Sequence, residues 1–477
     1  MKLQKIKTIG IFQILIAILL SMFSIAARSA DVSKIPKDTL ACNGFGYLTL
    51  YKPVKTVTDV VICISGDGGW NSGIEGIAMH LKNENTLIIG VDIRQVFKYM
   101  KKSKSACLYP AEDFERMSQF VQKKLGYQTY NIPVLLGYSS GATLVYGLVA
   151  QAPQNTFRAG IVLGFCPDIQ IDKPLCQGSG KFTNTKLSNG KGYDLGLAQN
   201  LITPFVSLQG QTDQVCNYQA TVAFLKNVTN AKVISLPKVG HGYGVEKNWL
   251  PQFMLAYNNI LEQKDKSIAE GMGKNLNLPL HITNPSEGKT SSYMVVFISG
   301  DGGWTDFDQQ MASSFAAKGA PVIGLDALKY FWQKKSPEQT TVDVTRIIET
   351  YQEEWKKEKV ILMGYSFGAD VIPFVYNRLP EKIKKDVAGV GLLSPSKDTD
   401  FEVHVSELFN IGSAPTGLSV PNEINKINDL HPICFFGKDE DDLPTELISK
   451  ENARIIYLDG GHHYTDSFGT ISKAMMP

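Results

Sequence analysis

The chain has 477 residues, of which 43% are hydrophobic and 20% are charged, and its formal net charge is +2. This composition is typical of a folded globular protein and leaves room for two or three domains. The near-neutral charge and the lack of a basic tract with interleaved aromatic residues argue against a nucleic-acid partner. We therefore expect a globular protein that does not bind nucleic acid.

Residues 1–30 have the pattern of a secretory signal peptide. Lysines near the start precede an apolar run from about Ile9 to Phe23, and small residues follow it up to Ala30. A segment of this kind directs export and is then removed. The alternative is an uncleaved membrane anchor, for which the apolar run is near the lower length limit. We expect an exported protein.

Six of the seven cysteines lie in the first half of the chain. In an exported protein this distribution predicts disulfides in that half. Cys166 and Cys176 flank a proline-containing loop and are our best candidates for one local bridge, whereas Cys63 and Cys434 lie within apolar runs and are expected to be free core thiols. No Cys-x-x-Cys pair or His/Cys cluster has the spacing of a metal site, so we expect no metal and no cofactor.

Three motifs occur twice in the same order, which indicates a duplicated domain. Ser-Gly-Asp-Gly-Gly-Trp stands at 65–70 and again at 299–304, and Gly-Tyr-Ser-x-Gly follows at 137–141 and 364–368. A Gly-His pair with a tyrosine two residues after the histidine comes near the end of each half, at 240–243 and 461–464. We expect domains at 31–262 and 289–477, joined by a polar linker at 263–288 that is broken by Gly and Pro.

Short apolar runs alternate with longer segments of helical periodicity in each half. Leu87–Val91 and Val134–Leu136 are examples of such runs. Continuous apolar runs separated by helices are typical of a parallel sheet that is covered on both faces. The predicted fold class is α/β, with tandem α/β-hydrolase-like domains, each a mostly parallel sheet covered by helices.

Ser139 and Ser366 each stand in a Gly-x-Ser-x-Gly segment where an apolar run meets a helix-like segment. This is the setting of the nucleophile elbow in α/β-hydrolases, where an acid and then a histidine follow the serine along the chain. A serine needs that histidine as its base, and the acid orients the histidine. In the first half Asp213 and His241 occupy these places after strand-like runs.

The second half leaves its acid ambiguous. Alignment of the two halves favours His462 over the neighbouring His463 as the base. Matching the residues around the acid of the first half selects Asp441, and the alternatives that remain open are Asp439, Glu440 and Asp442.

The Ser-Gly-Asp-Gly-Gly-Trp segments follow an apolar strand well before each elbow. In this fold that loop supplies one N–H donor to the oxyanion, and the residue after the nucleophile supplies the other. The expected oxyanion and substrate-binding residues are Gly66, Asp67, Gly68 and Ser140 in the first half, and Gly300, Asp301, Gly302, Gly303 and Phe367 in the second. An acid disfavours an adjacent oxyanion, so we expect Asp67 and Asp301 either to cap the next helix or to contact a cationic group of the substrate.

The motifs at 299–304, 326–337, 364–373 and 460–464 resemble those of the VirJ/AcvB family of bacterial virulence proteins, and the whole mature chain resembles the longer AcvB-like members. The resemblance implies a periplasmic serine ester hydrolase that acts on aminoacylated phosphatidylglycerol, notably the lysyl form, reached at the membrane surface. The alternative that it implies is a non-catalytic periplasmic component that binds proteins of a type IV secretion system.

Carried over by position, the resemblance makes Ser366 the nucleophile, His462 the base and Asp441 the acid, and we expect this second site to be the main one. The sequence departs from the family pattern at the acid, because Pro444 ends the acidic loop where a longer loop ending in cysteine is expected.

Overall fold

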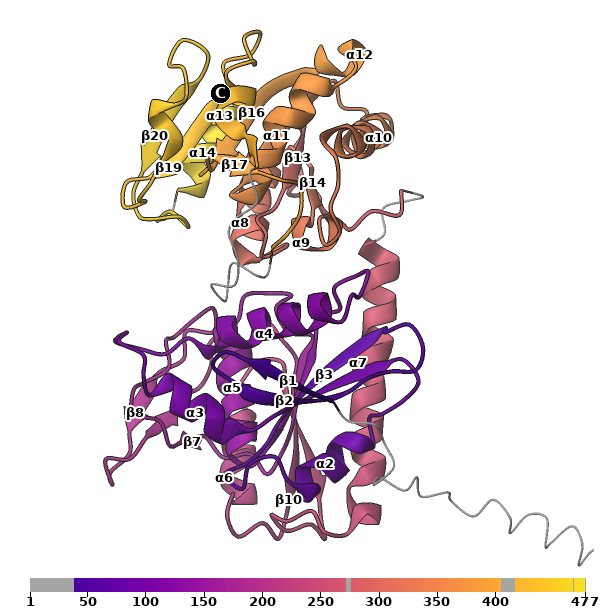
Figure 1. Cartoon of the computed structure of the whole chain (residues 1–477), viewed down its shortest axis with the longest axis vertical. Helices are drawn as coiled ribbons and strands as arrows, with labels where there is room; N and C mark the ends of the chain where they lie inside the picture. The colour runs from indigo at the N-terminus through magenta and orange to yellow at the C-terminus, as the bar shows by residue number, and fades with distance from the viewer. Residues whose placement is uncertain (1–37, 272–275, 405–416, 466, 477) are drawn as a thin grey trace, which may run out of the picture. The chain divides into compact units, whose positions relative to one another are not determined.

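The computed structural model describes residues 38–271, 276–404, 417–465 and 467–476. The predicted signal peptide at 1–30 lies outside these residues. Within the described ranges, no helix has both the length and the apolar character needed to cross a bilayer. Two large sheets follow one another along the chain, one in each half, and each is described here by itself (Figure 1).

The first sheet has eight strands in the order β1-β2-β4-β3-β5-β6-β10-β11. The strands from β4 to β11 pair in parallel, and β2 pairs antiparallel with both β1 and β4. Their bounds are Asp38–Cys42, Gly46–Tyr51, Thr86–Val91, Asp59–Ile64, Val134–Tyr138, Ala159–Leu163, Phe205–Gly210 and Ala231–Leu236, in sheet order. The helices between them are α2 (Ser72–Met79), α3 (Ile93–Met100), α4 (Pro110–Lys124), α5 (Ser140–Gln151), α6 (Tyr218–Leu225) and α7 (Leu250–Gly271), and a small sheet holds β7 (Asp168–Ile169), β8 (Asn184–Lys186) and β9 (Tyr193–Leu195).

The second sheet repeats this order with seven strands, β12-β14-β13-β15-β16-β19-β20. Strand β12 pairs antiparallel with β14, as β2 does with β4, and the remaining pairs are parallel. Their bounds are Leu280–Thr283, Val322–Leu325, Tyr293–Ile298, Lys359–Tyr365, Val387–Leu393, Ile433–Gly437 and Arg454–Leu458. The helices are α8 (Asp306–Ala316), α9 (Ala327–Tyr330), α10 (Pro337–Trp355), α11 (Phe367–Arg378), α12 (Glu381–Lys384), α13 (Val420–Ile424) and α14 (Phe468–Met475), and β17 (Asp398–Thr399) pairs with β18 (Leu418–Ser419).

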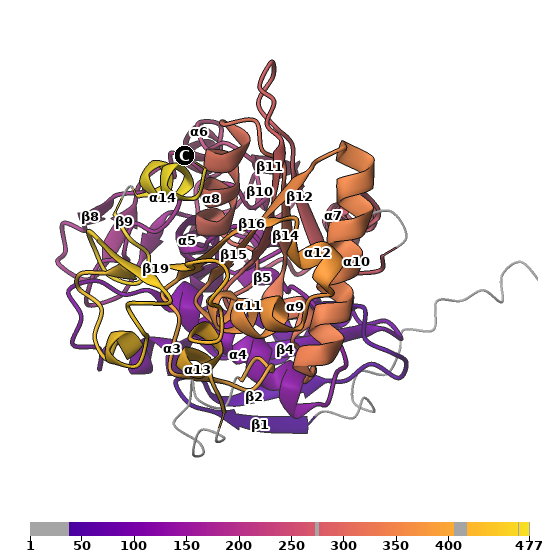
Figure 2. The ribbon, with the colours of Figure 1, turned by 90° about the horizontal axis from the view of Figure 1, so that it is seen from above.

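Both faces of the second sheet are buried, which explains its continuous apolar strands. Along β13, Met294 and Val296 belong to the core cluster under α10 and α11, whereas Val295 and Phe297 belong to the cluster under α8 and α14. In Figure 2, α8 and α14 lie side by side and apart from α10. The strand order, the two-sided burial and the crossover helices make each half an α/β-hydrolase-like domain, as the sequence predicts.

The predicted linker at 263–288 is wrong at both ends. Helix α7 continues to Gly271, and strand β12 begins at Leu280 and pairs with β14 of the second sheet. The sequence misled because the polar stretch after 262 has no apolar face to signal a helix, and a four-residue edge strand is too short to show a periodicity. Of the predicted linker, 272–275 lies outside the described residues.

The predicted Cys166–Cys176 bridge is also wrong. Cys166 pairs with Cys216, and Cys107 pairs with Cys176. A parallel bridge between Leu108 and Leu175 brings the second pair together across a long stretch of sequence. Cys63 and Cys434 are free and buried, as expected, and Cys42 is free and buried as well.

Candidate active site

Ser139 and Ser366 occupy the same strained turn between a strand and a helix. Their φ and ψ angles are 56° and −124° for Ser139 and 51° and −118° for Ser366. A positive φ costs a residue with a Cβ on the order of 1–3 kcal/mol, so the surrounding structure must enforce it. The backbone N–H of Ser139 donates to Leu163 at 3.0 Å and that of Ser366 donates to Leu393 at 2.8 Å, which ties each elbow to the neighbouring strand.

The elbow glycines are required by close backbone approach. A Cβ at Gly137 would lie 2.4 Å from the carbonyl oxygen of Gly141, and a Cβ at Gly141 would lie 2.4 Å from that of Ile64. The corresponding distances in the second half are 2.3 Å for Gly364 and 2.1 Å for Gly368. A side chain at Gly137 or Gly364 would push the helix away from the strand that presents the serine. A side chain at Gly141 or Gly368 would collide with the neighbouring strand, β3 or β13.

In the first half, Ser139, His241 and Asp213 form one hydrogen-bonded chain. The Nδ1 atom of His241 lies 2.9 Å from Oδ2 of Asp213, and its Nε2 atom lies 3.0 Å from Oγ of Ser139. An ionised carboxylate can only accept, so Nδ1 carries the proton and Nε2 is left to accept from the serine hydroxyl. The Asp213 side chain is fully buried and that of His241 is 18% exposed.

Backbone groups of its own loop hold the Asp213 carboxylate. Its Oδ1 atom accepts the N–H groups of Val215 and Cys216, each at 2.8 Å, which leaves Oδ2 for His241. On the other side of the histidine, the Tyr138 hydroxyl donates to the His241 carbonyl oxygen at 2.9 Å. The imidazole is therefore fixed both by its ring and by its backbone.

In the second half, the acid that contacts His462 is Glu440 and not Asp441. The Nδ1 atom of His462 lies 3.0 Å from Oε2 of Glu440. Within the described part of the chain, the hydrogen bonds of His462 do not include one to Ser366, and its side chain is 44% exposed. In the second candidate site, a hydrogen bond thus joins the acid to the histidine, but among the described residues none joins the histidine to the serine.

The acid of the second half can be found in the sequence by counting residues after the strand, although matching side-chain types between the halves selects the wrong residue. Asp213 is the third residue after Gly210, which ends its strand, and Glu440 is the third residue after Gly437. The backbone frame after the strand fixes the position, so counting from the glycine selects Glu440. Asp441 and the alternative Asp439 are exposed, and the remaining alternative, Asp442, forms an ion pair with Lys397.

His463, the weaker candidate for the base, bonds elsewhere. Its Nδ1 atom lies 2.8 Å from the Tyr365 hydroxyl, which also donates to the His462 carbonyl oxygen at 3.3 Å. Burial lowers the pKa of His463, and the neighbouring His462 lowers it further. Tyr365 corresponds to Tyr138. The two tyrosines contact the loops of the candidate histidines and were not predicted from the sequence, although both stand directly before the elbow serine.

The predicted oxyanion loops lie beside the elbow serines. A Cβ at Gly66 would be 3.0 Å from Cβ of Ser139, and one at Gly300 would be 3.6 Å from Cβ of Ser366. The helices after the elbows begin at Ser140 and Phe367, where backbone N–H groups have no partner within the helix. Exposed Gly68 and Gly302 and buried Gly303 complete the predicted loop residues.

Asp67 and Asp301 do not cap the helices that follow them. Asn71 caps α2 through its side chain, and Thr305 caps α8 in a capping box with Asp308. Both Asp67 and Asp301 are exposed at the loop that faces the elbow. The capping half of our hypothesis is therefore wrong, and contact with a cationic substrate group is the half that remains.

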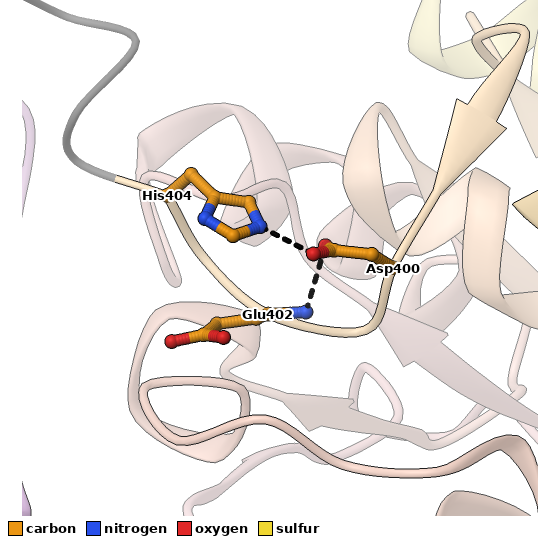
Figure 3. Close-up of side chains that lie close together, drawn as sticks. All are labelled: Asp400, Glu402 and His404. Atoms are coloured by element: carbon orange, nitrogen blue, oxygen red, sulfur yellow. Dashed lines mark hydrogen bonds and ion pairs between the residues drawn. The ribbon is translucent and has the colours of Figure 1, made fainter. Parts of the chain in front are cut away.

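One group of potential metal ligands occurs among the described residues, and the sequence analysis did not single it out. It consists of Asp400, Glu402 and His404, which follow β17 (Figure 3). The Nε2 atom of His404 lies 2.5 Å from Oδ2 of Asp400, and the ammonium group of Lys334 lies 3.9 Å from the same oxygen. The carboxylate is thus already engaged by a histidine and a cation, so we assign no metal to this group.

Comparison with known protein families gives a match on both halves. The model of the bacterial virulence protein VirJ matches residues 58–165 and 292–477. The chain belongs to the VirJ family. The VirJ match in the first half spans the oxyanion loop and the elbow and ends before Asp213 and His241, whereas in the second half it spans the entire candidate site.

Solved structures that resemble the chain include esterases. Est1E from Butyrivibrio proteoclasticus is 12% identical with a TM-score of 0.31, over 42% of this chain and 92% of that one. The esterase Est2 from Thermogutta terrifontis is 15% identical with a TM-score of 0.31, over 50% and 93%. MenH from S. aureus is 11% identical with a TM-score of 0.33, over 41% and 97%. Likenesses this weak carry no functional argument. No curated protein matches the chain.

Proposed function

We propose that the chain is a serine ester hydrolase whose better prepared active site lies in the first half. The observation that carries this proposal is the continuous Asp213–His241–Ser139 chain, with contacts of 2.9 and 3.0 Å. These distances are within the reach that a base needs to take the proton of its nucleophile. The second site, with Ser366 and His462, which the sequence leads us to expect as the main one, has the same elbow and a histidine that does not hydrogen-bond to its serine.

The reaction follows from the positions of these groups. The Ser139 oxygen attacks the ester carbonyl carbon while its proton passes to Nε2 of His241, and Asp213 stabilises the imidazolium. The N–H of Ser140 and the Gly66 loop donate to the tetrahedral oxyanion. The carbon–oxygen bond of the ester then breaks, and the alcohol leaves with the proton from His241. Water, activated by the same histidine, releases the acid and restores the serine.

We propose an aminoacylated phospholipid, notably lysyl-phosphatidylglycerol, as the substrate, and the periplasm as the location. This finer proposal rests on the family resemblance and on exposed carboxylates at both candidate sites. Asp67 is exposed beside the Ser139 elbow, and Asp301, Asp439 and Asp441 are exposed around the Ser366 elbow and its acid loop. Carboxylates there would attract the ammonium groups of a lysyl ester. Hydrolysis would release lysine and phosphatidylglycerol.

Labelling with a fluorescent fluorophosphonate tests the hydrolase proposal. We expect rapid labelling of the full chain, loss of the fast component in Ser139→Ala, a small loss in Ser366→Ala and no labelling in the double variant. Equal labelling of wild type and double variant would overturn the proposal. Vesicles that contain lysyl-phosphatidylglycerol then test the substrate, with free lysine as the readout and 4-nitrophenyl acetate as the neutral control ester.

A non-catalytic role for the second half is the other candidate, as a periplasmic component that binds secretion-system proteins. The specific observation in its favour is that the His462 side chain is 44% exposed and, among the residues that the structure describes, hydrogen-bonds to Glu440 and not to Ser366. If this role holds, Ser366→Ala leaves lysine release unchanged while Ser139→Ala abolishes it.

A further inference from the structure

In each half, one residue comes directly after the strand that neighbours the acid-bearing strand, and this residue differs between the halves. Gly164 follows β6 and Ser394 follows β16, and these two positions correspond because each directly follows its strand in the repeated fold. Each has a positive φ, 66° for Gly164 and 50° for Ser394. Glycine adopts this conformation without a steric cost, whereas serine does not. Serine at this position therefore calls for a compensating role of its hydroxyl.

We propose that Ser394 is a positioning residue that holds Glu440 against His462. In each half, the residue after the strand and the acid form a matched pair, which is Gly164 with Asp213 in the first half and Ser394 with Glu440 in the second. The inference rests on the proposed hydrolase function and assigns a role within the second site. It explains why the second acid is a glutamate three residues after the strand, where the first half has an aspartate.

The hydroxyl of Ser394 contacts the acid directly. Its Oγ atom lies 2.6 Å from Oε1 of Glu440, and the same Glu440 oxygen accepts the N–H of Gly437 at 2.6 Å. These two donors engage Oε1, so Oε2 is the oxygen that faces His462 at 3.0 Å. Ser394 is buried at 5% exposure, which shields this contact from competing water.

A tyrosine supports the serine from behind. The hydroxyl of Tyr464 lies 2.6 Å from Oγ of Ser394 and 3.1 Å from the carbonyl oxygen of Phe435. Ser394 donates its single proton to Glu440, so the single proton of Tyr464 is shared between Oγ of Ser394 and the carbonyl oxygen of Phe435. Tyr464 thus holds the serine hydroxyl in the position from which it donates to Glu440.

In the first half, a serine at this position would crowd the histidine. A Cβ at Gly164 would lie 3.0 Å from Cε1 of His241 and 3.1 Å from its Nδ1 atom. The tyrosine that corresponds to Tyr464 is Tyr243, and its hydroxyl accepts the N–H of Gly164 at 2.8 Å. The shorter Asp213 needs no side-chain donor, because two N–H groups of its own loop already hold it. Glycine and aspartate therefore fit together, as do serine and glutamate.

The test measures the fraction of neutral His462 that carries its proton on Nδ1, from the nitrogen NMR shifts of labelled histidine in the full chain, assigned with His462→Gln. A carboxylate that accepts from Nδ1 favours this tautomer. We expect Ser394→Ala and Glu440→Asp each to lower this fraction, and Ser394→Gly with Glu440→Asp to return it toward wild type, because this pair reproduces the first half. Asp441→Asn is the matched control and should leave the fraction nearly unchanged. Additive losses in the double variant, or an equal effect of Asp441→Asn, would overturn the inference.

Labelling of Ser366 in a Ser139→Ala background separates this inference from the proposed function. If the tautomer fractions change as expected and Ser366 is not labelled, Ser394 positions Glu440 in a site that is not hydrolytic. If the tautomer fractions do not change, the positioning role fails whatever the labelling shows. In the first half, Gly164→Ser should slow labelling of Ser139 at least tenfold, and adding Asp213→Glu should restore part of that loss. The melting temperature of every variant reports whether it folds.

Discussion

The two candidate sites have the same backbone geometry and differ in how many hydrogen bonds join the serine, the histidine and the acid. Both elbows have nearly equal φ and ψ, and both acids stand at the third position after a strand-ending glycine. In the first site the acid side chain is fully buried and the histidine is 18% exposed, whereas in the second these values are 10% and 44%. Duplication has thus kept the fold that presents a serine while the groups that activate it diverged.

The loops that carry the acids also differ in charge. The first loop, residues 211–216, contains one carboxylate and presents Val215 at 67% exposure. The second loop, residues 438–442, contains four carboxylates and one lysine. A cationic group is therefore attracted to the second site more strongly than to the first.

The largest difference should come from removing each base. His241→Ala in a Ser366→Ala background should slow fluorophosphonate labelling of Ser139 by about 10²–10⁴-fold, the usual contribution of a positioned base. His462→Ala in a Ser139→Ala background should slow labelling of Ser366 much less, because that histidine does not contact its serine. The rate of labelling checks both, with exposed His431→Ala as the control. Equal losses in the two halves would mean that the two histidines act on their serines to the same extent.

The disulfides should separate stability from activity. In the chain-entropy model, bridges that close loops of 50 and 69 residues each contribute about 4 kcal/mol to the free energy of unfolding. Only Cys166–Cys216 ends in the loop that holds Asp213, through the Cys216 N–H. The double Cys→Ser variant at 166 and 216 should therefore lower both the melting temperature and the labelling rate of Ser139.

The matched control is the double Cys→Ser variant at 107 and 176, which should lower the melting temperature to a similar extent and leave labelling of the folded protein unchanged. A loss of labelling in both variants would mean that the bridges act on the site only through global stability.

A buried acid of the second half should make stability depend on pH. The pKa of Asp370 is raised from its ordinary value of 3.8 to about 8, mainly by burial and also by the nearby Asp301 and Asp398, against hydrogen bonds from Ser396 that lower it. Between these values the folded state binds more protons than the unfolded state, so the free energy of unfolding falls as pH rises, by at most about 1.4 kcal/mol per pH unit.

Asp370→Asn should remove this slope, because the amide keeps the shape of the side chain and does not ionise. Melting temperatures between pH 5 and pH 8 check the effect, with exposed Asp439→Asn as the control. Thr143, the fourth residue after the elbow serine of the first half as Asp370 is of the second, donates to the Cys166 carbonyl oxygen at 2.6 Å and does not titrate. An unchanged slope in Asp370→Asn would assign the pH dependence to other groups.

The sequence predicted the features that repeat and missed those that depend on contacts between loops. Apolar runs and the two Gly-x-Ser-x-Gly segments were enough to predict parallel sheets and elbows, because local backbone geometry dictates both. The acid of the second site was missed because Asp441 matches Asp213 in side chain, while position along the backbone selects Glu440. The prediction of a Cys166–Cys176 bridge was wrong because the folding of the segment around β7 to β9 decides which cysteines meet, and the spacing of the cysteines along the sequence does not.

The elbow tyrosines were also missed, and they allow the smallest of these tests. Tyr138 donates to the His241 carbonyl oxygen at 2.9 Å, whereas Tyr365 contacts the His462 carbonyl oxygen at 3.3 Å and Nδ1 of His463 at 2.8 Å. Tyr138→Phe removes one hydrogen bond worth about 1 kcal/mol and should slow labelling of Ser139 about fivefold. Tyr365→Phe should change labelling of Ser366 less, because its shorter contact is to a histidine outside the proposed site. A larger effect of Tyr365→Phe would mean that His463 takes part in the second site. The two sites would then differ in the number of histidines that take part, and not in whether one histidine contacts its serine.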